Sequence, residues 1–150
     1  MTTADVLPLI RRGVLAVLVF GCVGLIGELV LLEHYAEINQ LPPLLLCAAM
    51  IVAVIVHWVG NGAKSVRALQ VVALMMVLSG ALGMYFHGEE NLEHATRDAE
   101  EYGEATSGSA FWMNVVKGDA PALAPGTMIQ FGLLALLYAY RHPALKRPEE

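Results

Sequence analysis

Five histidine and glutamate side chains have residue types and spacings that suit a divalent metal. His34 and Glu37 are three residues apart and follow the first apolar segment of the chain. His87, Glu90 and His94 follow the third apolar segment at spacings of three and four, which place them on one side of a helix. Imidazole and carboxylate ligands bind zinc, iron or copper. The pattern predicts a metal site between two outward-facing helix ends.

The same five residues also fit a solvent-exposed acidic surface, because a His-x-x-Glu spacing often arises by chance. A di-iron carboxylate oxidase is not indicated, since such proteins carry Glu-x-x-His on two helices and this chain has none. A haem bridged by two histidines needs both at one membrane depth, and only His34 and His87 meet that condition. His57, beside Trp58, is predicted at the opposite membrane boundary, in the interfacial aromatic belt.

Glu28 is the one acidic residue of the apolar segment 13–32, which has no basic residue. Some 20 apolar residues span the hydrocarbon core as a helix. An ionisable group at that depth is costly and is therefore a functional candidate. Two roles remain open for Glu28: a neutral carboxyl that hydrogen-bonds a neighbouring helix, or a group that handles protons or cations.

Small residues predict how these helices pack. Gly21, Gly24 and Glu28 recur at steps of three and four, so they share one helical face. Ser79 and Gly83 form a small-xxx-small pair in the third apolar segment. Such pairs allow close helix approach in lipid, where packing replaces the hydrophobic drive. We expect the first and third helices to meet at these residues, with Glu28 in their interface.

Composition identifies the class of protein. Of the 150 residues, 57% are hydrophobic and 15% are charged, which is far more apolar than a soluble domain of this size. Four segments are predicted to span the bilayer, at about 13–32, 43–59, 68–86 and 122–140. The last segment is the least certain span to assign from sequence, because its continuous apolar run, 126–140, has only 15 residues; a re-entrant segment is its alternative. The prediction is an all-α integral membrane protein, a four-transmembrane-helix bundle forming one domain over 1–150.

Basic residues predict the orientation of the four helices. Seven of the nine lysines and arginines fall on one side of this topology, at positions 11, 12, 64, 67, 141, 146 and 147. The positive-inside rule then places both termini in the cytoplasm, as in a bacterial inner membrane protein. The segment 87–121 becomes a long acidic extracytoplasmic loop between the third and fourth helices. Arg97 and Lys117 are its basic residues.

Two other features favour structural roles. Cys22 and Cys47 lie inside apolar segments and form no CxxC pair, so we expect buried thiols without a disulfide. Phe111, Trp112 and Val115 recur at helical spacing within the long loop. They predict a short helix that lies on the outer leaflet or packs over the bundle.

No nucleophile constellation, phosphate loop or dinucleotide fingerprint is present, and the net charge of −5 argues against nucleic acid. We therefore expect a non-enzymatic accessory or assembly subunit that packs in lipid against other membrane proteins, in a larger complex or as a homo-oligomer. The alternative is a small carrier or binding protein for a divalent metal or cation. It would use the five histidines and glutamates outside and Glu28 within. A membrane enzyme with an outward-facing metal is a third, weaker hypothesis.

Overall fold

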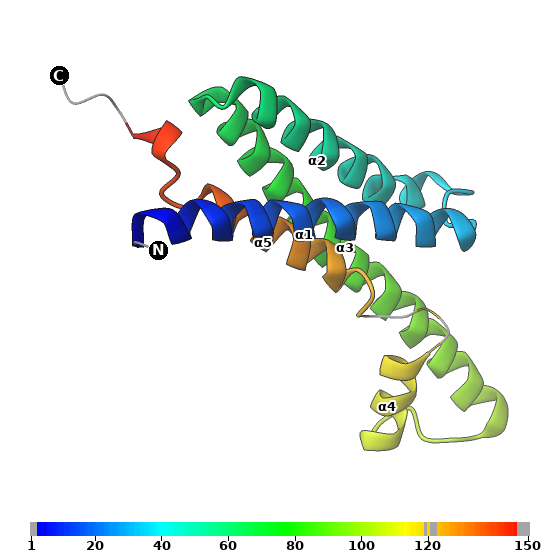
Figure 1. Cartoon of the computed structure of the whole chain (residues 1–150). Helices are drawn as coiled ribbons and strands as arrows, with labels where there is room; N and C mark the ends of the chain where they lie inside the picture. Colours follow the sequence, from blue (N-terminus) through cyan, green and yellow to red (C-terminus); the bar gives the residue numbers. More distant parts are fainter. Residues whose placement is uncertain (1–2, 119, 121–122, 147–150) are drawn as a thin grey trace.

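The computed structural model describes residues 3–118, 120 and 123–146, and all regular structure within them is helical. Its elements are α1 (Thr3–Leu31), η1 (Ile38–Gln40), α2 (Leu41–Gly60), α3 (Ala63–Tyr102), α4 (Ser109–Lys117), α5 (Gly126–Ala139) and η2 (Pro143–Leu145). Helices α1, α2, α3 and α5 form the main body, while α4 packs against the far end of α3 (Figure 1).

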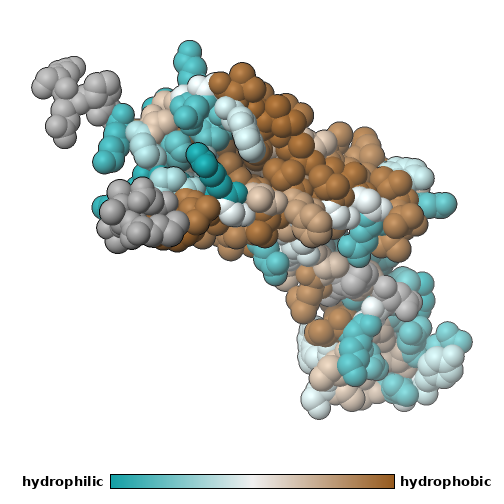
Figure 2. Space-filling model, in the orientation of Figure 1, coloured by the Kyte–Doolittle hydropathy of each residue, from teal (hydrophilic) through white to brown (hydrophobic). Residues whose placement is uncertain are grey.

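Three helices are long and apolar enough to cross a membrane: Val6–Leu31, Ile38–Gly60 and Ala63–Tyr102. Their apolar side chains largely face outward; Phe20 is 81% exposed and Val59 is 84% exposed. Figure 2 shows this hydrophobic surface gathered over the body formed by α1 and α2, with hydrophilic residues more frequent around the far end of α3 and α4. Burying such a surface in lipid removes the cost of hydrating it. The structure is that of a helical membrane protein.

The hairpin between α2 and α3 follows directly from local sequence. Pro42 and Pro43 lie in the first turn of α2, where backbone N–H groups have no intrahelical partner. Asn61 ends the helix in the left-handed conformation (φ 38°) and donates its N–H to the His57 carbonyl. The span predicted at 43–59 therefore differs from α2 by a few residues only.

Helix α3 continues well beyond the predicted span of 68–86 and extends unbroken to Tyr102. The prediction of a loop from 87 is thus wrong for 87–102. Gly88 costs about 1 kcal/mol in a helix, but the Glu, Leu, Ala and Arg residues that follow favour helix and offset it. The helix ends at Gly103, whose φ of 67° suits glycine and whose N–H reaches the Ala99 and Glu100 carbonyls. Residues 119 and 121–122 of the predicted loop lie outside the described residues.

The short helix predicted within that loop is α4, and it packs against the extended part of α3. Phe111 and Val115 are buried, whereas Trp112 and Val116 are exposed. At the junction after α4, the buried Asn91 side chain donates to the Ala120 carbonyl (2.7 Å) and accepts from the Ala120 N–H (3.0 Å). The short helix therefore covers the α3 extension rather than the transmembrane bundle.

Helix α5 runs antiparallel to α3 in very close contact. Pro125, before α5, lies against Gly80 and Gly83, and Gly132 lies against the backbone of Ala73. With 14 residues, α5 is shorter than the three long helices. It begins four residues after the start of the segment predicted at 122–140, because residues 123–125 form a turn.

The expected contact between the first and third helices is wrong, because α5 occupies that position. A Cβ atom at Gly21 would lie 2.5 Å from the Phe131 ring of α5, and one at Gly83 would lie 2.8 Å from Pro125. Helix α1 packs instead on α2 and α5. Small residues mark where a helix can approach closely, but they do not identify which helix does so.

The core shared by these four helices is apolar and well packed. It includes Leu18, Cys22, Met50, Leu69 and Met76, each fully buried. Both cysteine thiols are free and buried, as predicted, and the Cys47 Sγ lies 3.8 Å from the Met128 Sδ.

Candidate functional site

His34 and His87 face one another at the end of the bundle where α1 stops. Glu33 adopts a left-handed conformation (φ 52°), and the His34 N–H bonds the Leu29 carbonyl at 2.8 Å, so the chain turns back over the helix end. His87 extends from α3. The two imidazole rings are stacked, with centroids 6.4 Å apart and planes 18° apart.

One nitrogen of this pair is unsatisfied. The His87 Nδ1 is buried, and no described residue hydrogen-bonds it. A buried polar atom without a partner costs about 1–3 kcal/mol. A bound water, proton or cation at this nitrogen would remove that cost. His34 and His87 are therefore the two predicted metal ligands that the fold brings together.

The other three predicted metal ligands, Glu37, Glu90 and His94, are exposed. Glu37 lies at the start of η1, where its N–H bonds the Gln40 side chain at 3.3 Å. Across the described ranges, no group of three or more His, Cys, Asp or Glu residues is arranged to hold a metal ion. A metal at this end would have two imidazole ligands from this pair and would need others from outside it.

Glu28 lies on an open face of α1 and not in the predicted helix interface. The carboxylate is exposed. The two glycines beside it, Gly24 and Gly27, have no atom within 4 Å of the position a Cβ would occupy. Gly24, Gly27 and Glu28 lie on one side of α1 together with Val17 and Phe20, and all five residues are exposed. We call Val17, Phe20, Gly24, Gly27 and Glu28 the open α1 face.

We compared the chain with known families, curated proteins and solved structures. None matches it. The sites must therefore be interpreted from their own geometry.

A hydrogen-bonded network lies buried at the opposite end of the bundle. His57 is 3% exposed; its Nδ1 lies 2.8 Å from the Ser65 hydroxyl, and its Nε2 contacts the Tyr138 hydroxyl. The Tyr138 hydroxyl also lies 3.3 Å from the His142 Nε2. We call these four side chains the buried network. Trp58 is 83% exposed, whereas His57 lies inside the bundle and not on its surface as the predicted interfacial belt requires.

The direction of every hydrogen bond in the buried network follows from its two ends. The Ser65 hydroxyl donates to the Gly62 carbonyl, so it accepts from His57 Nδ1–H. His57 Nε2 then accepts from the Tyr138 hydroxyl. At the other end, His142 Nδ1 accepts from the Ala144 N–H, which leaves its Nε2–H to donate to Tyr138. Both imidazoles are neutral in this arrangement, and each ring nitrogen is satisfied.

Arg11 joins the start of α1 to the end of α5 beside this network. Its Nη2 donates to the carbonyls of Tyr140 and Arg141, each at 3.1 Å. No local sequence pattern predicts the buried network, because His57 and Tyr138 are 81 positions apart. The pairing arises only when α5 packs on α3.

The buried network predicts that stability depends on pH. Burial lowers the pKa of the His142 imidazole below its usual value of about 6.5, and the nearby His57 and Arg11 charges lower it further. Between the two pKa values the unfolded chain binds more protons, so the free energy of unfolding decreases as pH falls through this window. The melting temperature in detergent should fall as the pH is lowered from about 7.5 through the usual imidazole pKa of about 6.5 and below it. His142→Gln should reduce this slope, and an unchanged slope would rule out His142 as the titrating group.

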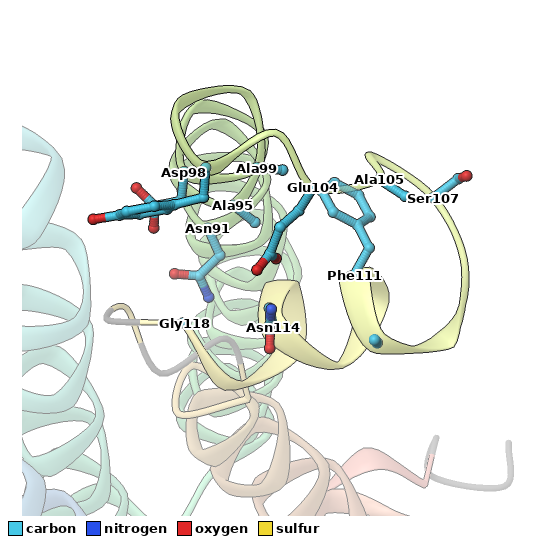
Figure 3. Close-up of a pocket in the computed structure, with 12 residues that line it drawn as sticks. Asn91, Ala95, Asp98, Ala99, Glu104, Ala105, Ser107, Phe111, Asn114 and Gly118 are labelled. Atoms are coloured by element: carbon cyan, nitrogen blue, oxygen red, sulfur yellow. The ribbon is translucent and has the colours of Figure 1, made fainter.

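A concave region lies between the α3 extension and α4 (Figure 3). Its volume is about 300 Å³, and its lining includes Asn91, Asp98, Glu104, Phe111 and Asn114. Asn91 is already fully paired with Ala120, and Asp98, Glu104 and Asn114 are exposed. This region therefore resembles a packed hairpin end more than a binding site.

Proposed function

We propose that this protein is a non-enzymatic accessory or assembly subunit whose open α1 face docks a transmembrane helix of a partner. The observation that carries the proposal is the position of Glu28, an exposed carboxylate beside two open glycines inside an apolar helix. Glycines let another helix approach closely. A partner helix with a hydrogen-bond donor or a basic group opposite Glu28 would compensate the carboxylate.

The position of Glu28 near the end of its apolar segment supports docking of a partner at this face. Glu28 lies three residues before the end of the apolar segment Val6–Leu31, about 5 Å along the helix axis. A carboxylate that faces lipid costs up to about 3 kcal/mol at the bilayer centre, and less near the boundary. Pairing with a partner residue recovers this free energy only in the complex, so Glu28 favours association. A second copy of this chain or a larger membrane protein would satisfy it equally.

We further propose that α5 is a fourth span, with both termini in the cytoplasm of a bacterial inner membrane. The antiparallel contacts of α5 extend from Gly83 to the level of Ser65 on α3, which is most of the depth of that helix in the bilayer. Arg11 links the start of α1 to the end of α5 at one side. Seven of nine basic residues also lie on that side in this topology.

Glu28→Leu tests the docking proposal. In mildly solubilised native membranes, the wild-type protein should migrate as a complex larger than the 16.2 kDa chain in its detergent micelle. Glu28→Leu should shift most of it to the monomer, because the variant removes the group that the partner compensates. Glu93→Leu is the control, since it removes an exposed carboxylate on the α3 extension. Equal behaviour of the two variants would refute a specific role of Glu28.

A second candidate function, binding of a divalent metal or cation, is favoured by the stacked His34–His87 pair and its unsatisfied nitrogen. Zinc, iron or copper binds imidazole nitrogen at about 2.1 Å, so a modest rotation of the rings would allow both to ligate one ion. Purified protein should then contain about one equivalent of metal, lost in the double variant His34→Ala, His87→Ala. His94→Ala is the matched control. Metal retained in the double variant, or absent from the wild type, would exclude this function.

A further inference from the structure

An elongated groove lies between α1 and α2 at the end of the bundle that carries the buried network. Its volume is about 970 Å³. Apolar residues of α1 line one side, α2 lines the other, and Tyr138 of α5 contributes to the floor. Figure 1 shows α1 and α2 diverging toward this end. The groove shares Phe20 with the open α1 face, but its other α1 residues lie outside that face. Its interpretation depends only on membrane location.

The groove has the length of one leaflet. Its α1 lining begins at Arg12 and ends at Val23. These 11 helical steps correspond to about 17 Å, close to half of the ~30 Å hydrocarbon thickness. Leu15 and Val19 lie between them and present aliphatic side chains at steps of three and four. An extended acyl chain would follow this apolar path from the boundary toward the bilayer centre.

The mouth of the groove has the chemistry of a headgroup site. Arg12 is exposed at the mouth, whereas the neighbouring Arg11 is held by two backbone carbonyls. Asn61, the exposed residue that ends α2, and the exposed Trp58 lie at the same end. A guanidinium binds phosphate oxygens through paired N–H donors. Tryptophan residues favour the headgroup level of a bilayer.

We propose that this groove binds an anionic glycerophospholipid, with its phosphate on Arg12 and one acyl chain along Leu15, Val19 and Val23. Charge complementarity selects this occupant, because the groove is apolar along its length and cationic at one end only. The amphiphile that matches has one negative head and an aliphatic tail. The buried network beneath the groove supplies a rigid floor, since its hydrogen bonds are all internal.

Lipid titration tests this proposal. The purified protein in detergent is titrated with phosphatidylglycerol or phosphatidylcholine of identical chains, and binding is followed by native mass spectrometry. Phosphatidylglycerol should bind about fivefold more tightly in the wild type, and Arg12→Gln should abolish this preference. Arg67→Gln is the control, because Arg67 is exposed at the same end but does not line the groove. Equal binding of the two lipids, or equal effects of the two variants, would overturn the proposal.

Cross-linking identifies the occupant directly. A photoreactive benzophenone amino acid replaces Ala16, an exposed residue that lines the groove. The variant is reconstituted in vesicles of phosphatidylglycerol and phosphatidylcholine and irradiated. An adduct of phosphatidylglycerol mass, in excess over its share of the lipid mixture, supports the proposal. An adduct of twice the protein mass identifies a second copy in the groove and overturns it.

Discussion

Replacing Gly132 with alanine should destabilise the protein by about 1–3 kcal/mol, the range expected for an overpacked core. This result opposes helix propensity, which favours alanine over glycine by about 1 kcal/mol. The cause is the close approach of α5 to α3. A Cβ atom at Gly132 would lie 2.6 Å from the carbonyl oxygen of Ala73 and 2.7 Å from a methyl group of Val77. A backbone oxygen cannot rotate away, so the helices must separate.

Gly126→Ala is the matched control within the same helix. A Cβ atom there would meet nothing within 4 Å. This variant should therefore be neutral or stabilised by up to about 1 kcal/mol. Thermal unfolding of both variants in the same detergent makes the comparison. If Gly132→Ala were as stable as Gly126→Ala, the α3–α5 contact described above would be incorrect.

Replacing His57 with alanine should cost about 3 kcal/mol or more, because it combines two losses. The imidazole is buried, so its removal leaves a cavity. It also leaves the Tyr138 hydroxyl without its His57 acceptor, while the Ser65 hydroxyl loses one of its two donors and keeps the Gly62 N–H. Tyr138→Phe keeps the ring and removes one hydroxyl, so it should cost about 1–3 kcal/mol. Chemical or thermal unfolding in detergent measures both values.

Two comparisons make this prediction specific. Trp58→Ala, at the adjacent but exposed position, should change stability by only about 0.5 kcal/mol. The double variant His57→Ala, Tyr138→Phe should be less destabilised than the sum of its parts, since each single variant already breaks the shared hydrogen bond. Strict additivity would mean that the two side chains do not interact.

Hydropathy and turn chemistry predicted much of this fold. The three long helices and the turn at 60–62 follow from apolar length and from residues that end helices, such as Asn61. The helical spacing of His87, Glu90 and His94 allows a helix past Gly88, but the acidic, glycine-containing stretch as a whole favours a loop and does not predict a helix to Tyr102. Its helix depends on residues that favour helix locally and on Phe111 and Val115, which cover it from α4.

Which helices of the chain pack against each other was less predictable than where each helix lies in the sequence. Gly21 and Gly83 are sites of close approach, as predicted, but Gly21 receives Phe131 of α5 and Gly83 receives Pro125 just before α5. This reassignment leaves Gly24 and Glu28 on the surface. Steric compatibility restricts where helices meet, whereas the choice among compatible helices depends on the whole core. That core includes side chains far apart in sequence, such as Cys47 and Met128.

The candidate sites, like the helix contacts, were predictable only in part. His34 and His87 were predicted at one depth, and their rings lie 6.4 Å apart. Glu37 remains exposed, since α1 ends at Leu31 and the turn that follows redirects the chain. Glu90 is exposed on α3. The buried network had no sequence signal at all, because neither His57 nor Tyr138 belongs to a local motif. Its polar groups match only in three dimensions.

The bundle combines a packed apolar core with an open helix face on α1. The buried network and Arg11 fix one end of the bundle, and the glycine contacts fix α3 to α5. The open α1 face stands apart, because it combines exposed glycines with a carboxylate in an apolar segment. It is the surface on which the proposed accessory role depends.

Site-specific photo-cross-linking in native membranes tests that role most directly. A benzophenone amino acid is placed at Gly24 on the open α1 face, or at Ala48, a small exposed residue of α2, as the control. If a partner helix docks on this face, position 24 should give one discrete protein adduct that is absent from position 48 and is lost when Glu28→Leu is added. Adducts with lipid alone at both positions, or the same protein adduct from both, would contradict a docking role for this face.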